Sequence, residues 1–241
     1  MSERIKILFL GAKPTDSIRL RLDEEARQIR DKLRTTESRD SVDMVSAWAE
    51  TASDLQASLL RHSPHIVHFS GHGDKIPQIF LQSHTGAVAP VDPKALKRLF
   101  SILKDELRMV VLDRCYSPSL GDAMVEVVDF TLGISEKMPE SNAVSFLAGF
   151  YQALAYGRSV LEAFKLATNL LDLLDLEDAT SSTLPVLLVR KGVDKYAIPF
   201  LPESPSQSSV DISLGDSVNF AGSIMIQPPE PWPNRLRRKA G

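Results

Sequence analysis

The sequence predicts an α/β fold built on an open, mostly parallel β-sheet with helices on both faces. Short apolar runs alternate along the chain with longer segments whose apolar residues recur every three or four positions. Two of the runs, residues 65–70 and 109–112, are typical of buried strands, and each is followed by a predicted turn. A repeated order of strand, helix and strand favours parallel pairing, because the helix returns the chain to the starting end of the sheet.

The first part of the chain begins with a strand and a helix. The run at residues 5–10 stops at the turn-forming sequence Gly11-Ala12-Lys13-Pro14. The next segment has the helical period, and one apolar face carries Leu22, Ala26, Ile29 and Leu33. The predicted strands of this part cover residues 5–10, 42–49, 65–70 and 77–81, and the predicted helices cover residues 18–33 and 53–60. Residues 83–86 are the predicted turn of a short edge hairpin.

The second part continues the alternation. Asp92 at the N-cap and Pro93 at the first helical position predict the start of a helix. The predicted helices of this part cover residues 93–107, 120–128, 141–155 and 159–174, and the predicted strands cover residues 109–112, 130–134 and 184–189. Pro185 favours a strand start or an edge position for the last of these, because proline lacks a backbone donor.

The composition changes after residue 198. Residues 1–198 are predicted to form the α/β domain, and residues 199–241 a Pro/Ser-rich linker and C-terminal tail. Within that tail, residues 210–226 can supply one or two weak strands.

Composition and charge exclude several classes of protein. The apolar fraction of 43% and the charged fraction of 24% are those of an ordinary globular protein. A formal net charge of −3 gives no reason to expect direct binding to nucleic acid. The single cysteine excludes an internal disulfide and fits a reducing cytosol. No apolar run is long enough for a membrane span or a secretory signal, so a cytoplasmic location and no membrane partner are expected.

Two residues at strand ends carry the candidate chemistry. Cys115 follows the 109–112 strand, and His72 follows the 65–70 strand between Gly71 and Gly73. If the two strands are neighbours in a parallel sheet, a thiol and an imidazole meet at one edge, which is the minimum for a cysteine peptidase. Taken alone, either residue has a plainer interpretation, because a free cysteine is often a small buried hydrophobe and His72 could be a solvent-facing loop residue. Their matching positions favour a shared site.

Further features of the sequence bear on this site. A predicted helix follows Cys115, and its amino end would favour a thiolate. The backbone amides of Gly73 and Cys115 are candidate donors to an oxyanion, since glycine lets an N–H point into a cleft. The three histidines His65, His68 and His72 have a spacing that would converge on a helix but not on a strand. This spacing therefore disfavours a zinc site.

A family resemblance rests on these two strand ends. The runs His65-Ile-Val-His-Phe-Ser-Gly-His72-Gly and Val110-Val-Leu-Asp-Arg-Cys115-Tyr-Ser resemble the two signature motifs of CHAT domains, caspase-like cysteine peptidases of clan CD. The resemblance extends over roughly residues 4 to 190. It implies a caspase-like fold in residues 1–198, with His72 as base, Cys115 as nucleophile and a protein or peptide substrate. It implies neither a metal nor an organic cofactor. It also implies a regulated effector in bacterial or antiviral defence or cell death, with an activating or regulatory protein as a further partner.

The residues before the nucleophile depart from the family pattern. CHAT domains commonly have asparagine and alanine there, whereas this chain has Asp113 and Arg114. An aspartate two residues before the cysteine resembles metacaspases, which cut after arginine or lysine. A carboxylate at the floor of a pocket would select such a cation, so Asp113 is a candidate substrate-binding residue. Alternatively, Asp113 pairs with Arg114 or another local base. Glu136 and Glu140 are candidates for the rim of the substrate groove, or else they are solvated loop charges.

Two other functions stay open at this point. A catalytically silent caspase-like scaffold would bind protein partners through the same cleft. A nucleotide-binding α/β domain is disfavoured, because Gly11-Ala12-Lys13-Pro14 after the first strand lacks the glycine spacing of the common phosphate loops.

Overall fold

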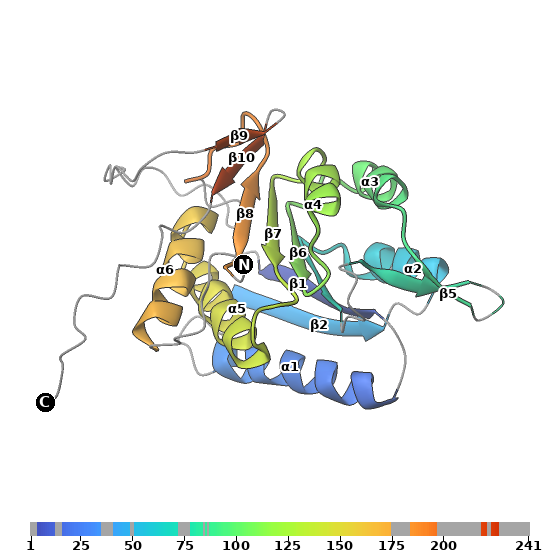
Figure 1. Ribbon diagram of the computed structural model, residues 1–241, viewed down its shortest axis with the longest axis horizontal. Coiled ribbons are helices and arrows are strands. Elements are labelled where there is room, and N and C mark those ends of the chain that lie inside the picture. Colours follow the sequence, from blue (N-terminus) through green and yellow to red (C-terminus); the bar gives the residue numbers. More distant parts are fainter. Residues whose placement is uncertain are drawn as a thin grey trace, which may run out of the picture.

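The structure is a computed structural model of the 241-residue chain, and one large sheet dominates it (Figure 1). It describes residues 4–12, 16–34, 41–48, 51–71, 78–83, 85, 87–174, 184–196, 218–220 and 223–226. The strands are β1 (Ile5–Ala12), β2 (Val42–Trp48), β3 (Ile66–Gly71), β4 (Phe80–Gln82), β5 (Val88–Pro90), β6 (Met109–Asp113), β7 (Phe130–Ile134), β8 (Val186–Val189), β9 (Val218–Phe220) and β10 (Ser223–Ile226). The helices are α1 (Asp16–Arg34), α2 (Ala52–His62), α3 (Pro93–Ile102), α4 (Pro118–Val125), α5 (Glu140–Ala155) and α6 (Val160–Leu173).

The order of the main sheet confirms the predicted fold class. Its strands run in the order β2-β1-β3-β6-β7-β8-β10-β9. The first five strands of that order pair in parallel, whereas β8, β10 and β9 join antiparallel. The chain passes from β1 to β2 on one side and then to β3 on the other, so the winding reverses at β1. In such sheets, ligands bind beyond the carboxyl ends of the strands.

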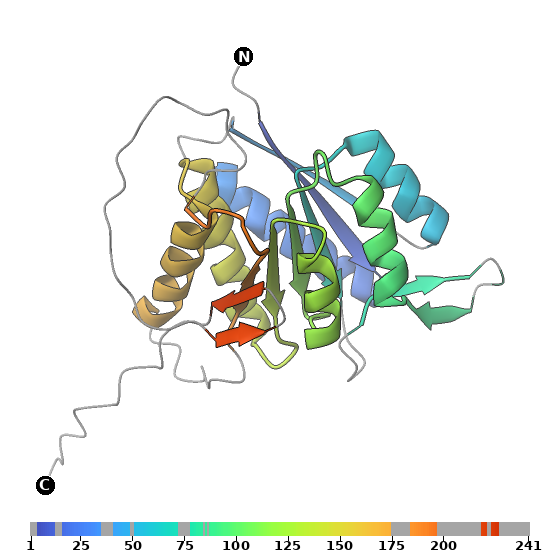
Figure 2. The same ribbon diagram turned by 90° about the horizontal axis from the view of Figure 1, so that it is seen from above.

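Helices cover both faces of the sheet, as Figures 1 and 2 show. α1, α5 and α6 pack on one face, where Ile29, Phe146 and Phe164 belong to a single buried core. α2, α3 and α4 cover the other face, where the core includes Leu59 and Phe100. β3, β6 and β7 are buried along their whole length because both of their faces are covered.

The predicted elements agree with the observed ones apart from their ends. α3 ends at Ile102 rather than at residue 107, after a tighter turn in which the Leu103 N–H donates to the carbonyl of Phe100. α4 begins at Pro118 rather than at residue 120, because Ser117 caps it and proline is accepted at the first helical position. The edge hairpin is present as a separate two-stranded sheet of β4 and β5.

The C-terminal strands extend the main sheet. β10 pairs with β8, and β9 pairs with β10, so a segment beyond residue 198 lies beside the predicted α/β domain. The division at residue 198 therefore stays a prediction. Among the residues that the structure describes, no helix is long and apolar enough to cross a bilayer.

Candidate functional site

The two strands that precede the candidate residues are neighbours. β3 and β6 pair in parallel, with Ser70 opposite Asp113, so both strands end at the same edge of the sheet. A β-carbon placed on Gly71 would lie only 3.2 Å from the Cβ of Cys115. The last residue of β3 and the turn after β6 are therefore in contact, at the edge where the sequence predicts that the two candidate residues meet.

The proposed base lies outside the described part of the chain. His72 and Gly73 belong to residues 72–77, which the structure does not describe. The distance from the imidazole to the thiol and the oxyanion role of Gly73 consequently stay predictions.

Cys115 occupies a tight, apolar turn after β6. Arg114 bends the chain with a φ of 57°, a left-handed conformation, and its N–H donates to the carbonyl of Ile134. The Cys115 side chain is 1% exposed and packs in the core beneath α3 and α4. Its thiol donates to the carbonyl of Phe69 over 3.8 Å.

The electrostatics of this turn favour a protonated thiol. Burial raises the pKa of Cys115 well above 9.0, and the charge of Asp113 adds to the effect. The expectation that the amino end of the following helix favours a thiolate is not met, since desolvation is the larger influence. The described arrangement therefore holds the Cys115 thiol in a poorly nucleophilic, protonated form.

Asp113 points to the other face of the sheet. It follows Met109 and Val111 at the alternate positions of β6, and those two side chains belong to the core under α1, α5 and α6. The Asp113 side chain is 0% exposed, so the carboxylate is enclosed and does not line an open groove. Its candidate role in substrate binding stays a prediction.

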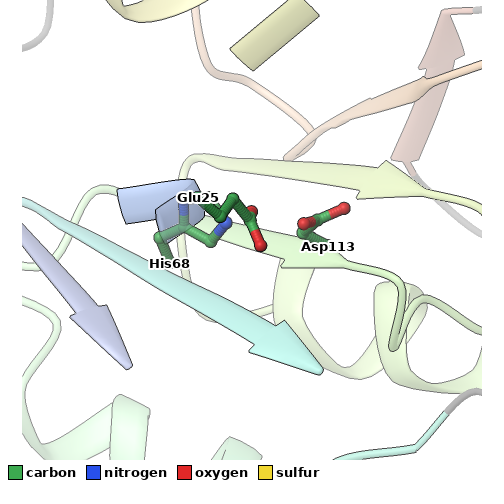
Figure 3. Close-up of side chains that lie close together, drawn as sticks. All are labelled: Glu25, His68 and Asp113. Atoms are coloured by element: carbon green, nitrogen blue, oxygen red, sulfur yellow. The ribbon is translucent and has the colours of Figure 1, made fainter. Parts of the chain in front are cut away.

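Asp113 is one of three buried polar side chains that converge here. Glu25 on α1 and His68 on β3 are the others, and each of the three offers a potential ligand atom within 4.8 Å of the other two. In Figure 3 the Glu25 carboxylate lies between the imidazole of His68 and the carboxylate of Asp113. We call Glu25, His68 and Asp113 the buried triad.

Two hydroxyl groups orient the buried triad. The Ser70 hydroxyl donates to Oε2 of Glu25 at 2.9 Å, and the Tyr151 hydroxyl lies 2.9 Å from Nδ1 of His68. Among the residues that the structure describes, Oε1 of Glu25, Nε2 of His68 and both carboxylate oxygens of Asp113 have no hydrogen-bond partner. Buried polar atoms without partners are rare in native proteins, so this group calls for a physical explanation.

Burial also changes the protonation of the buried triad. It raises the pKa of Glu25 well above 4.5, and the neighbouring Asp113 charge raises it further. Burial likewise raises the pKa of Asp113. Burial lowers the pKa of His68 to about 3, so this imidazole is neutral at physiological pH.

The other candidate side chains lie around the Cys115 turn. The Arg114 guanidinium donates to the carbonyl of Met138 over 3.5 Å, whereas neither Asp113 oxygen has a partner among the described residues. The charge of Arg114 nevertheless acts on Asp113 and lowers its pKa against the larger effect of burial, so the alternative local pair of Arg114 with Asp113 stays open. Glu136 is half-buried in the segment after β7, and Glu140 is exposed at the start of α5. The role of Glu136 in substrate binding stays a prediction.

Glu25 and Tyr151 are not among the residues predicted from the sequence. The position of Glu25 in its helix does carry a signal of burial. Glu25 lies three residues after Leu22 and four before Ile29, on the apolar face of the predicted helix. A carboxylate on such a face needs a partner or an ion in the core. Tyr151 gives no comparable signal, since a tyrosine within an apolar helix is ordinary.

A surface pocket lies elsewhere, between α2 and α3. Leu59, Leu60 and Ile102 line it, together with Pro64 and Leu107. The last two residues precede β3 and β6, so this pocket is at the amino-terminal edge of the strands. It is remote from Cys115 and is not the candidate site.

The chain is similar to a curated protein and to a solved structure. No known protein family matches the chain. A curated protein of Gillisia limnaea described as "Probable protease" is 26% identical over 153 residues, which are 63% of this chain and 27% of that protein. The chain thus spans about a quarter of that relative's length. The crystal structure of the Drosophila initiator caspase Dronc aligns with a TM-score of 0.39 and 13% identity, over 69% of this chain and 73% of that chain.

Proposed function

We propose that the chain is a caspase-like cysteine endopeptidase of the CHAT type, with Cys115 as nucleophile and His72 as general base. The observation that carries the proposal is the parallel pairing of β3 with β6, which brings Gly71 against Cys115. His72 is bonded to Gly71, and consecutive Cα atoms are about 3.8 Å apart, which favours an imidazole beside the thiol. The similarity to a protein described as a probable protease supports the same reaction class.

The proposed reaction is acyl transfer to the thiol. His72 takes the proton of Cys115, and the sulfur attacks the carbonyl carbon of the substrate peptide bond. The amides of Gly73 and Cys115 stabilise the oxyanion, and His72 passes its proton to the leaving amine. Water then hydrolyses the thioester and restores the thiol. No metal or organic cofactor takes part in these steps.

The burial of the thiol supports a resting state that must be opened. Cys115 is enclosed and protonated as described, so substrate access needs the turn at residues 114–117 to move. An activating protein is the expected trigger, because an unrestrained peptidase would damage its own cell. The role in bacterial defence or cell death follows from the family resemblance and is part of this proposal.

The proposal includes cleavage after arginine or lysine. Asp113 lies two residues before the nucleophile, and Glu25 places a second carboxylate beside it. Two buried carboxylates that no described ion pair neutralises would discriminate strongly for a guanidinium or ammonium group. Turnover of an aspartyl substrate above an arginyl one would contradict this part of the proposal and leave the peptidase assignment intact.

The test is a fluorogenic peptide library with the wild type and the Cys115→Ala variant, each with and without candidate activating proteins. The proposal predicts cleavage by the wild type, selective for one residue before the cut, and loss of at least about a hundredfold in the variant. Equal cleavage by both proteins would overturn the assignment of Cys115.

A silent caspase-like scaffold is the second candidate function. The observation that favours it is the high pKa of the enclosed Cys115 thiol, since a permanently protonated thiol is no nucleophile. A scaffold would bind its partners equally well after Cys115→Ala and would cleave no peptide under any condition.

A further inference from the structure

The buried triad joins three elements just below the edge that carries Cys115. Glu25 comes from the first helix, His68 from the middle of β3 and Asp113 from the end of β6. All three side chains are enclosed, with exposed fractions of 3%, 0% and 0%. Because their ligand atoms lie within 4.8 Å of one another, a single small ion could contact all of them after a modest contraction.

Each residue of the buried triad has at least one side-chain N or O atom without a described hydrogen-bond partner. In Glu25 and His68, a second atom is hydrogen-bonded to a neighbouring hydroxyl group, which fixes the side chain. Ser70 holds Oε2 of Glu25 and leaves Oε1, and Tyr151 holds Nδ1 of His68 and leaves Nε2. Asp113 is the last residue of β6, and neither of its carboxylate oxygens has a hydrogen-bond partner among the described residues. Outer hydrogen bonds of this kind orient the ligands of metal sites and fix the tautomer of a ligating histidine.

We propose that Glu25, His68 and Asp113 bind one divalent first-row transition-metal ion, for which zinc and manganese are the probes. Two ionised carboxylates carry the charge that such an ion neutralises, and a neutral imidazole supplies the nitrogen lone pair. Calcium is a poor candidate, because it prefers six to eight oxygen ligands.

The histidine spacing gave no hint of this site. The spacing of His65, His68 and His72 predicts only that their side chains do not converge along a strand. The site instead takes one histidine and recruits its carboxylates from α1 and β6, which are far apart in the sequence.

A bound ion would clamp α1 to β3 and β6. The last ligand, Asp113, is two residues before Cys115, so the clamp would fix the start of the turn that holds the thiol. The proposal goes beyond the peptidase assignment and does not depend on it. In the peptidase proposal Asp113 binds the arginine or lysine side chain of the substrate, whereas here it binds a metal ion. Bound metal is therefore expected to compete with that substrate side chain.

The experiment measures metal binding to the full chain in the Cys115→Ser background, after chelation and desalting. That background removes the thiol, which could otherwise bind zinc together with His72. We expect calorimetric titration with Zn²⁺ and with Mn²⁺ to show one ion per chain for at least one of the two metals. The melting temperature is expected to rise on addition of that metal.

Isosteric variants assign the ligands. Glu25→Gln and Asp113→Asn should each weaken metal binding at least about a hundredfold and remove the thermal shift. Glu24→Gln is the matched control, because Glu24 is the adjacent carboxylate of α1 and pairs with Arg27 at the surface. Circular dichroism of each metal-free variant establishes that it is folded before the titration.

Two results would overturn the metal site. One is the absence of binding of either ion below about millimolar concentration in the folded Cys115→Ser protein, since a buried three-ligand site binds far more tightly. The other is binding that persists unchanged in both Glu25→Gln and Asp113→Asn. Neither result bears on the peptidase proposal, because the Cys115→Ser protein has no nucleophile.

Discussion

Cys115 is 1% exposed in a core that it shares with side chains of β3 and of the helices α3 and α4, and this burial has a direct chemical consequence. The native thiol should react with iodoacetamide at least about tenfold more slowly than the same chain in urea, because alkylation needs a local opening. Intact-mass spectrometry measures the rate without ambiguity, since the chain contains only one cysteine. Equal rates in the two conditions would contradict the enclosed position of the thiol.

Arg114 carries backbone strain immediately before Cys115. Its φ of 57° is costly for a residue with a β-carbon, so Arg114→Gly should raise the free energy of unfolding by about 1 kcal/mol. Loss of the guanidinium contact with the Met138 carbonyl offsets part of that gain. Ser63→Gly is the matched control, because Ser63 ends α2 with a φ of 40°. Urea denaturation checks both variants, and destabilisation by Arg114→Gly alone would show that the side chain matters more than the strain.

At the scale of elements, the ring of Tyr116 links the Cys115 turn to α4 and β7. A β-carbon on Gly121 would lie 2.7 Å from this ring, and one on Gly133 would overlap it more severely. Gly133→Ala should therefore displace Tyr116 and lower the free energy of unfolding by about 1–3 kcal/mol. The measurement is a double-mutant cycle by urea denaturation with Tyr116→Ala.

The cycle has a definite expected sign. Gly133→Ala should be much less harmful in the Tyr116→Ala background, because the ring that it strikes is gone. Additive effects of the two changes would mean that the ring does not lie between the two glycines.

The sequence predicted most elements because their signals are local. Asp92 with Pro93 marks the start of α3, and the apolar faces of the helices repeat at the helical period. The pairing partners were not predictable in the same way. β8 joins β7 antiparallel, and nothing in its apolar run distinguishes the two directions. Glu25 shows the same limit for the site, because its place on an apolar face signals burial but not which strands it meets.

At the scale of the whole molecule, β9 and β10 extend the main sheet beyond the domain boundary predicted at residue 198. β10 covers the edge of β8, pairing Ile224 with Val189. A chain truncated after residue 198 should keep the sheet from β2 to β8 but expose that apolar edge, and should therefore self-associate. Size-exclusion chromatography and circular dichroism check this outcome. A truncated chain that fails to fold would place residues 199–226 within the domain itself.

The candidate site combines parts of very different predictability. Cys115 and the end of β3 could be placed together from the sequence, because parallel strands share an edge, and the pairing of β3 with β6 confirms that step. The buried triad could not, since it depends on how α1 packs beneath the sheet. The enclosed state of the thiol was also beyond the sequence, because burial is a property of the assembled core.

The central claim is that the Cys115 sulfur and the His72 imidazole act as one unit. The decisive measurement is the rate at which an arginyl peptide chloromethyl ketone modifies Cys115. Intact-mass spectrometry measures this rate in the wild type and in His72→Ala. If the two residues act together, the wild type is modified once, and the rate of modification is at least about a hundredfold lower in His72→Ala. Equal rates in the two proteins would contradict the Cys–His pair.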